Sequence, residues 1–207
     1  MENLTPMLIL ASQSSARKAL LAGAGLRFET ARADIDERAL EDDFRASGTN
    51  AAGIALALAE AKALAVSKDQ NDSFVIGADQ TLALDQELLH KPIDRDAAAG
   101  QLDRLRGRSH QLHAGVALGR DGKILWSGVE TATLTLREFS SAERDDVLAR
   151  EGAAILGCVG SYRLEGPSIR LFEKVDGDYF TILGLPLLPL LAAMRLHAPH
   201  LLSEPAA

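Results

Sequence analysis

An apolar segment, a hydroxyl-rich turn and an amphipathic segment follow one another near the start of the chain. Residues 7–11 are apolar and predict a short buried strand, whereas residues 16–22 repeat apolar side chains at helical spacing. The intervening Ser-Gln-Ser-Ser of residues 12–15 therefore predicts a tight strand-to-helix turn. A strand that leads directly into a helix begins an α/β pattern, so this segment constrains the fold class more than any other.

The same turn has the properties of an anion-binding site. The first N–H groups of a helix have no partners within the helix, and the positive end of the helix dipole lies beside them. Ser12 and Ser14 would add hydroxyl donors, and Arg17 would add a guanidinium one turn inside the helix. The alternative is that one serine only caps the helix and Arg17 is a solvated surface charge. Taken alone, the turn favours this alternative, because capping serines are common and the turn is not rich in glycine.

Composition restricts the class of protein and the kind of partner. A chain of 207 residues that is 47% hydrophobic can bury a full core, as one domain in one or two lobes. The formal net charge of -7 argues against a nucleic-acid polymer as partner. The single cysteine cannot form an internal disulfide, no signal-peptide pattern precedes the first strand, and a glycine and two prolines interrupt the most apolar stretch, residues 181–196. We therefore expect a soluble cytoplasmic protein that does not engage a membrane.

The remaining patterns alternate between helix and strand and predict one mixed α/β domain over residues 1–207. Helices are expected over residues 51–67, 94–105, 140–150 and 187–196. Strands are expected over residues 26–31, 74–79, 109–118 and 124–136, with a hairpin over residues 169–183; residues 81–84 are expected to continue extended into a turn. The acidic segment 34–43 predicts an exposed loop, and the tail from about residue 197 is expected to fray.

An apolar run that ends on an acid marks the centre of the chain. Residues 74–78 predict a buried strand, and Asp79 is expected at its carboxyl end. In open α/β sheets the ligand crevice lies beyond the carboxyl ends of the strands, so Asp79 is placed to meet a substrate. The alternative is that Asp79 only caps a turn.

Basic residues at the ends of predicted elements complete a candidate polyphosphate site. Arg17, Lys62 and Lys91 can neutralise successive phosphates, and Lys91 is held extended by the proline that follows it. The carboxylates of Asp79 and Glu37 can hold Mg²⁺ or Mn²⁺, and either can deprotonate water. The alternatives are that Lys62 is a charge near a helix end and that Glu37 belongs to a solvated loop.

Other chemical centres have little support. His110 and His113 have no neighbouring cysteine, so a zinc site is not expected. Cys158 has no partners for nucleophilic catalysis and is expected to be a small buried residue. The chain also has no glycine-rich phosphate loop and no dinucleotide-binding fingerprint.

Six ordered motifs over nearly the whole chain resemble those of the Maf-like nucleoside triphosphate pyrophosphatases. They are Leu-Ala-Ser-Gln-Ser-Ser-Ala-Arg at 10–17, Ile-Gly-Ala-Asp at 76–79, Lys-Pro at 91–92, Gly-Arg-Ser-His at 107–110 with Gly-Val-Ala-Leu at 115–118, the segment 160–166, and Gly-Leu-Pro-Leu at 184–187. The resemblance implies a two-lobed α/β fold with a mixed β-sheet, flanking helices and a central cleft, related to the inosine triphosphate pyrophosphatases. It also implies a cytoplasmic, often dimeric enzyme that uses a divalent cation to cut a nucleoside triphosphate into a monophosphate and pyrophosphate. Such enzymes are linked to cleaning of the nucleotide pool and to control of septum formation.

The resemblance also assigns roles to individual residues. Asp79 takes the general-base position, and Glu37 matches an acidic position in the cleft. The family's phosphate-handling positions fall on Ser12, Ser14, Arg17, Lys62 and Lys91. Many members have Pro-Arg at positions 15–16 and Thr at position 114, where this chain has Ser-Ala and Ala. Arg17 is therefore the only arginine in the motif of residues 10–17.

Two further positions concern the base of the nucleotide. Gln80 and Glu165 stand where the branch that cleaves dTTP and UTP tends to have Thr and Gln, and both resemble the 7-methyl-GTP branch. A carboxylate only accepts hydrogen bonds, which suits the adjacent N1–H and 2-amino donors of guanine, and it also attracts the charge that N7-methylation adds. We therefore expect a 7-methyl-GTP pyrophosphatase. The alternatives are a dTTP/UTP pyrophosphatase, or a nucleotide-sensing protein without catalysis, in which Glu165 only caps the loop of residues 160–166.

Overall fold

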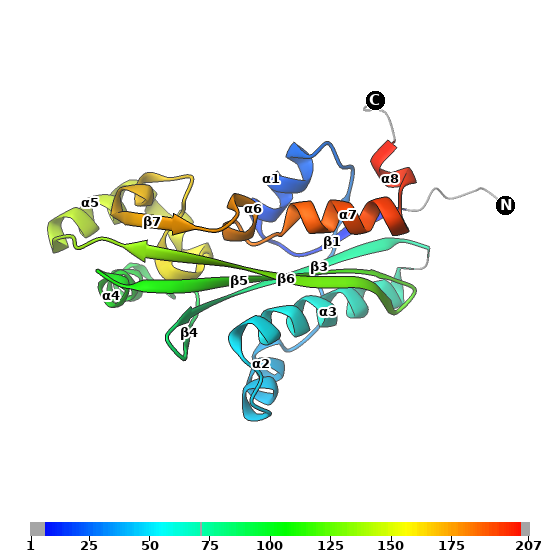
Figure 1. Cartoon of the computed structure of the whole chain (residues 1–207), viewed down its shortest axis with the longest axis horizontal. Helices are drawn as coiled ribbons and strands as arrows, with labels where there is room; N and C mark the ends of the chain where they lie inside the picture. Colours follow the sequence, from blue (N-terminus) through cyan, green and yellow to red (C-terminus); the bar gives the residue numbers. More distant parts are fainter. Residues whose placement is uncertain (1–6, 71, 204–207) are drawn as a thin grey trace.

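The computed structural model describes residues 7–70 and 72–203, which form a mixed sheet covered by helices (Figure 1). The strands of this sheet lie in the order β2-β1-β3-β5-β6-β7, and β4 pairs with β3 beside this path. β1 runs parallel to β2 and β3, whereas the remaining pairs are antiparallel. The strands are β1 (Leu8–Ala11), β2 (Glu29–Thr30), β3 (Phe74–Leu84), β4 (Glu87–Leu89), β5 (Ser109–Arg120), β6 (Lys123–Leu136) and β7 (Phe172–Asp176). The predicted mixed α/β fold is confirmed.

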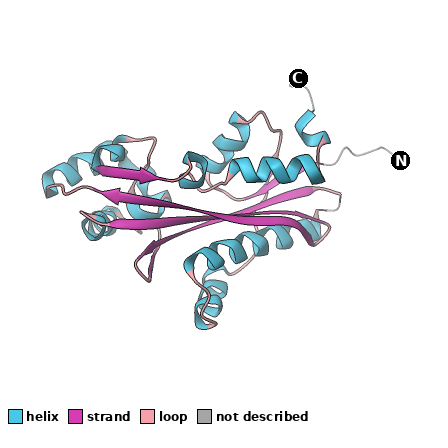
Figure 2. Cartoon of the chain, viewed as in Figure 1, coloured by secondary structure: helices cyan, strands magenta, loops and turns pink. Residues whose placement is uncertain are grey.

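Helices lie on both sides of the sheet. The α-helices are α1 (Ser15–Gly23), α2 (Glu37–Ala46), α3 (Ala51–Asp69), α4 (Arg95–Leu105), α5 (Ser141–Glu151), α6 (Tyr179–Ile182), α7 (Leu187–His197) and α8 (His200–Ser203). Three short 3₁₀ helices follow α5, namely η1 (Gly152–Gly157), η2 (Val159–Ser161) and η3 (Pro167–Leu171). In Figure 2, α2 and α3 lie below the sheet, whereas α1, α6 and α7 lie above it. Within the described residues, no helix combines the length and the apolar character that a membrane crossing requires.

α3 packs directly on the backbone of the sheet. A Cβ atom at Gly77 of β3 would lie 2.0 Å from the carbonyl oxygen of Ala59, and one at Gly115 of β5 would lie 2.3 Å from that of Ala55. Both alanines are fully buried. Only glycine on the strands allows this approach, because any side chain would displace the helix backbone. The depth of α3 in the structure is therefore set by these two glycines.

The apolar core on the opposite face of the sheet divides into two main clusters. One joins β1, α1 and α7 and includes Leu10, Leu21, Ile76, Leu118 and Leu190. The other joins α4, α5 and the 3₁₀ segment and includes Leu102, Leu112, Leu134, Val147 and Tyr162. β5 contributes Leu118 to the first cluster and Leu112 to the second. One continuous strand thus spans both clusters, while the single-domain interpretation stays a prediction.

The prediction of an exposed loop over residues 34–43 is wrong. This segment is exposed but helical, because Asp36 caps α2 by accepting a hydrogen bond from the N–H of Ala39 at 3.0 Å. Leu40 and Phe44, one turn apart, are its partly buried apolar residues. The segment has few apolar residues among its acidic ones, so its composition favoured a solvated loop although Leu40 and Phe44 share one helix face.

Two expectations for the C-terminal quarter are also wrong. Residues 172–176 form β7, which pairs with β6, but residues 179–182 form α6 instead of a returning strand. Asp178 caps this helix through the N–H of Thr181 at 2.9 Å. The segment expected to fray carries α8, in which the ring of His200 lies 5.7 Å from that of Phe74. Residues 204–207 lie outside the described residues.

The strand expected over residues 26–31 is reduced to Glu29–Thr30.

Replacing Gly77 with alanine should destabilise the fold and disturb α3. We expect Gly77→Ala to lower the free energy of unfolding by about 1–3 kcal/mol or more, because the new methyl group would overlap the α3 backbone. Gly119→Ala is the matched control, because a Cβ there would lie 3.4 Å from the nearest atom, the Cβ of Ala63 on the same helix. Urea unfolding of the three proteins measures both effects. Equal stability of Gly77→Ala and the wild type would contradict the account of this contact.

Candidate active site

One edge of β3 has a gap in its strand pairing. β1 pairs with β3 up to Ala11 opposite Gly77, and β4 pairs with β3 from Leu82 onward. Residues 78–81 of β3 therefore have no strand partner on this edge among the described strands; we call this segment the edge gap. Because β1 is parallel to β3 and β4 is antiparallel, the chain leaves both strands toward the gap. Ser12 follows β1 and Lys91 follows β4 within two residues.

Asp79 lies within this gap. The prediction that its strand ends at Asp79 is wrong, because β3 continues to Leu84. What ends is the neighbouring strand β1, whose last partner on β3 is Gly77. Asp79 therefore still lies beyond the carboxyl end of a parallel strand, where α/β sheets place their ligands.

Three predicted site residues meet beside the gap. The Nζ atom of Lys62 lies 2.6 Å from Oδ1 of Asp79 and 2.8 Å from Oε2 of Glu37. The side chains of Lys62 and Asp79 are 9% and 13% exposed, whereas that of Glu37 is 54% exposed. Lys62 lies well inside α3 and is buried, so its interpretation as a solvated charge near a helix end is wrong. α2, α3 and β3 each supply one member of this cluster, which we call the carboxylate–lysine cluster.

Arg17 is buried and fastens three segments together. Its Nε–H donates to the carbonyl of Gly184 at 2.7 Å, and its Nη1 donates to the carbonyl of Ala78 at 2.9 Å and to Oγ of Ser12 at 3.0 Å. It thereby joins the turn after β1, the edge gap and the loop between α6 and α7. The interpretation of Arg17 as a solvated surface charge is wrong.

The charge of Arg17 is coupled to the carboxylate–lysine cluster. Burial lowers the pKa of Arg17, whereas the negative charges of Asp79 and Glu37 raise it in part. A guanidinium stays charged in proteins even when its pKa falls. Arg17 therefore contributes a fixed positive charge near the two carboxylates.

The two serines of the first turn have different partners. Ser14 caps α1, and its Oγ accepts a hydrogen bond from the N–H of Arg17 at 3.4 Å, as the capping alternative predicted. The Oγ of Ser12 accepts from the N–H of Ser14 at 3.3 Å and from Arg17. The Ser12 hydroxyl proton is thus free to donate to a ligand.

Gln80 projects to the face of the sheet opposite Asp79, because neighbouring residues of a strand alternate. Its Nε2 donates to the carbonyls of Thr181 at 3.1 Å and Ile182 at 3.0 Å. Both amide N–H groups are therefore committed to α6. Gln80 thus docks α6 on the sheet and keeps only its Oε1 atom for another partner, a constraint that the sequence did not indicate.

Lys91 and Glu165 lie on two exposed loops near Cys158. Burial raises the pKa of the Cys158 thiol, and the charge of Glu165 raises it further, whereas Arg163 and Lys91 act in the opposite direction. Lys91 and Glu165 are therefore both within electrostatic range of one thiol. Cys158 itself is half-buried, which is less than the sequence predicted.

Gln101 joins these two loops and was missed by sequence reasoning. Its Oε1 accepts from Oγ of Ser161 at 2.7 Å, and its Nε2 donates to the carbonyl of His90. Ser161 has a φ of 61° and follows Gly160, whose φ is 80°. The segment 160–166 was identified only by motif, and nothing in the periodicity of α4 indicated that Gln101 contacts it.

His110 and His113 contact hydroxyl groups. Nε2 of His110 lies 2.7 Å from the Tyr162 hydroxyl, and Nδ1 of His113 lies 2.8 Å from Oγ1 of Thr131. Burial lowers the pKa of His110 to about 4, so this ring is neutral near pH 7. In the described part of the chain, no three His, Cys, Asp or Glu side chains are grouped as metal ligands.

Glu37 and Asp79 nevertheless fit a shared divalent cation. Each uses one oxygen for Lys62, and among the described residues the other oxygen of either carboxylate accepts no hydrogen bond from the protein. Both carboxylates contact the same nitrogen atom, so they lie close together, and their remaining oxygens are the donors that a cation would use. Mg²⁺ is commonly held by one or two carboxylates together with substrate phosphates and waters, so this donor set is sufficient.

Two cavities lie elsewhere on the face that α3 covers. One of about 430 Å³ adjoins the start of α3 and the β3–β4 turn, and includes Asn50, Gln86 and His113 in its wall. The other, of about 270 Å³, continues along β5 past Gln111. Neither is lined by a predicted site residue, so the site is assigned from the side chains that meet at the edge gap.

Comparisons with known proteins agree with the motifs. The profile of the family described as "Maf-like protein" matches residues 7–197. A "7-methyl-GTP pyrophosphatase" of Brucella abortus is 51% identical over 192 residues, or 93% of this chain and 96% of the relative. One of Rhizobium meliloti is 51% identical over 92% of this chain and 96% of the relative. A "Nucleoside triphosphate pyrophosphatase" of Bradyrhizobium diazoefficiens is 52% identical over 91% of this chain and 92% of the relative.

The family match extends from the first residue of the described structure through the end of α7. It includes every residue of the carboxylate–lysine cluster, the turn of residues 12–15, and the two loops that carry Lys91 and Glu165. The chain belongs to the Maf-like protein family.

Proposed function

We propose that this protein hydrolyses a nucleoside triphosphate to the monophosphate and pyrophosphate, with Asp79 as the general base. The observation that carries the proposal is the carboxylate–lysine cluster at the edge gap, next to the helix N-terminus formed by the first turn. A base beside a phosphate-binding turn is the arrangement that attack of water on phosphorus requires. The names of the relatives support this activity.

In this reaction Asp79 takes a proton from water, and the water oxygen attacks the α-phosphorus. The bond from that phosphorus to the bridging oxygen breaks, and pyrophosphate leaves with the electron pair. Lys62 holds one oxygen of Asp79, which fixes the carboxylate's orientation, and a remaining lone pair of the carboxylate receives the proton. No covalent intermediate on the protein is needed, because phosphoryl transfer depends mainly on positioning and charge neutralisation.

Charge balance at the site calls for further cations. Arg17 and Lys62 together balance the charges of Glu37 and Asp79 before any substrate binds. A triphosphate brings additional negative charge, which Lys91 alone does not neutralise. We infer that Ser12, Ser14 and Lys91 contact the phosphates and that Glu37 and Asp79 hold Mg²⁺ or Mn²⁺. The bound metal would withdraw charge from the phosphate oxygens.

We further infer that Gln80 and Glu165 favour 7-methyl-GTP as substrate. Both N–H groups of Gln80 donate to α6, so Gln80 offers only a carbonyl oxygen, and Glu165 offers only carboxylate oxygens. Acceptors suit the N1–H and 2-amino donors of guanine, whereas O4 of uracil or thymine needs a donor. Two of the relatives carry the name 7-methyl-GTP pyrophosphatase, which supports this inference.

The alternatives to this function are cleavage of dTTP or UTP, and nucleotide sensing without catalysis.

We also propose that the chain is one domain, acts in the cytoplasm and forms a homodimer, as the family resemblance implies. Size-exclusion chromatography with light scattering tests the dimer, and a monomer at all concentrations would contradict it.

Chelation should abolish turnover if the metal proposal is correct. We expect excess EDTA to stop pyrophosphate release and Mg²⁺ or Mn²⁺ to restore it, because the four nearby protein charges already cancel. After the reaction is quenched, inorganic pyrophosphatase supplied with its own metal converts the released pyrophosphate into phosphate, which is then measured. The chelator in the first step therefore does not affect the detection. Full activity in EDTA would remove the metal from the mechanism.

The nucleotide panel tests both the activity and the base. We expect pyrophosphate release with kcat/KM highest for 7-methyl-GTP among 7-methyl-GTP, GTP, dTTP and UTP. Glu165→Gln should reduce that preference by about tenfold or more, because it replaces an acceptor with a partial donor and removes the charge. Glu173→Gln, an exposed glutamate on β7, is the control. Binding of the nucleotides without release of pyrophosphate would favour the sensing alternative. A preference of the wild type for dTTP or UTP would contradict the assignment of the base.

A further inference from the structure

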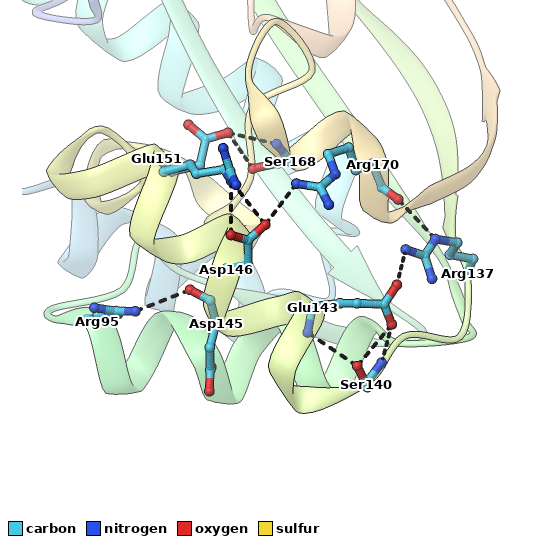
Figure 3. Close-up of polar contacts among 10 residues, drawn as sticks. Arg95, Arg137, Ser140, Glu143, Asp145, Asp146, Glu151, Ser168 and Arg170 are labelled. Atoms are coloured by element: carbon cyan, nitrogen blue, oxygen red, sulfur yellow. Dashed lines mark hydrogen bonds and ion pairs between the residues drawn. The ribbon is translucent and has the colours of Figure 1, made fainter.

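Glu151 is a buried carboxylate that the proposed reaction does not use. It is the last residue of α5, and its side chain is 0% exposed. Its Oε1 accepts hydrogen bonds from the N–H of Ser168 at 2.9 Å and from the Ser168 hydroxyl at 2.6 Å. Its Oε2 accepts from Nε of Arg163 at 2.7 Å and pairs with Nη2 of Arg163 at 2.7 Å. Figure 3 shows the contact with Ser168.

The two partners of Glu151 are the two ends of one loop. Residues 163–168 run from Arg163 to Ser168, and Glu165 lies between them. The loop backbone also closes over the carboxylate, because a Cβ at Gly166 would lie 2.5 Å from Oε1 and 2.9 Å from Oε2 of Glu151. One buried carboxylate therefore fastens both ends and the middle of the loop that carries Glu165.

α5 is a firm support for this contact. Ser140 and Glu143 form a capping box at its start, and Glu143 also accepts from Arg137 at 2.8 Å. These hydrogen bonds, led by that from the Ser140 backbone, lower the pKa of Glu143 to about 2. Asp146, one turn later, accepts from Arg170 of η3 at 2.9 Å (Figure 3). Asp146 thus ties α5 to the segment that follows the 163–168 loop, whereas Glu143 holds the start of the helix.

Burying a carboxylate is costly unless every oxygen is satisfied. Burial alone would raise the pKa of Glu151, but the hydrogen bonds from Ser168 and Arg163 outweigh it and leave the pKa lowered. Glu151 is therefore ionised near pH 7. A buried ion pair commonly adds little stability relative to apolar residues, and its better-attested use is to select one conformation. The conformation selected here is that of the loop.

We propose that Glu151 is a positioning residue for nucleotide recognition: it fixes the loop of residues 163–168 so that Glu165 lies next to the Lys91 end of the edge gap. This inference rests on the proposed function, in which Glu165 reads the base. Glu151 touches neither the nucleotide nor the reacting atoms and acts only through the loop.

Glu151→Gln tests the inference with little change in shape. An amide in this position can still accept from Ser168, but its NH₂ group faces the donors of Arg163 and releases that end of the loop. We expect the kcat/KM ratio between the preferred nucleotide and the other three to fall about tenfold, mainly through KM, since misplacing a contact weakens binding before chemistry. With the preferred nucleotide at saturation, kcat should stay within about threefold of the wild type.

The double variant separates positioning from general loss of stability. If Glu151 acts through Glu165, the variant Glu151→Gln with Glu165→Gln should lose no more selectivity than Glu165→Gln alone. Glu143→Gln is the matched control, because this carboxylate lies on the same helix and does not contact the loop. It should lower the melting temperature and leave the selectivity ratio unchanged.

Should Glu151→Gln fail to fold, Ser168→Ala removes one hydroxyl hydrogen bond to the same carboxylate and should lower selectivity about threefold.

The outcomes distinguish this inference from the proposed function. If Glu165→Gln changes selectivity and Glu151→Gln does not, or if the double variant is additive, the inference is overturned and the base assignment stands. If neither variant changes selectivity, both are overturned. If the preferred nucleotide is not 7-methyl-GTP but the two variants lower selectivity for it without additivity, the inference holds and the substrate assignment fails.

Discussion

The contact between α3 and the glycines of the sheet determines where the buried charge of this protein lies. Gly77 and Gly115 let the α3 backbone approach β3 and β5 closely, and Lys62 then reaches Asp79 at 2.6 Å. A buried ammonium needs partners, and Asp79 and Glu37 supply two. Removing Lys62 would leave two carboxylates facing one another, and removing both carboxylates would leave an unpaired ammonium. The packing of a helix and the chemistry of the candidate site therefore depend on the same contact.

The site is assembled from segments that the edge gap brings together. Because β1 stops at Ala11 and β4 stops at Leu89, the chain turns toward the open edge of β3 from both sides. Arg17 fastens the side of β1 and the loop at Gly184, while Gln101 and Glu151 fasten the two loops on the side of β4. The charged residues at the gap are thus supported by polar residues outside the apolar core, of which Arg17 and Glu151 are buried and Gln101 is partly buried.

Sequence patterns indicated the elements with a marked apolar run or a clear cap, namely β1, α1, α3, α4, α5 and α7. They also placed Asp79, Lys62 and Glu37 in one candidate site, in part through the motif resemblance, and the structure brings these three side chains together. α2 and α6 were missed because each is short or weakly apolar, and a capping aspartate decided the helix locally. The end of β3 was misplaced because Asp79 interrupts the apolar run, whereas pairing with β5 and β4 carries the strand on to Leu84. The partners of Gln80 and Glu151 lie 101 or more and 12 to 17 residues away, and no local pattern indicates such contacts.

The central claim is that Asp79, oriented by Lys62, is the base of a pyrophosphate-releasing reaction. Single-turnover measurement of pyrophosphate release by purified Asp79→Asn tests it most directly, with nucleotide binding and melting temperature measured on the same sample. Asp85→Asn, an exposed carboxylate in the turn that follows the same strand, is the control. The account predicts a loss of about 10²–10⁴ in rate with binding retained, because a general base contributes that much. Turnover near the wild-type rate in a folded Asp79→Asn protein would contradict the account.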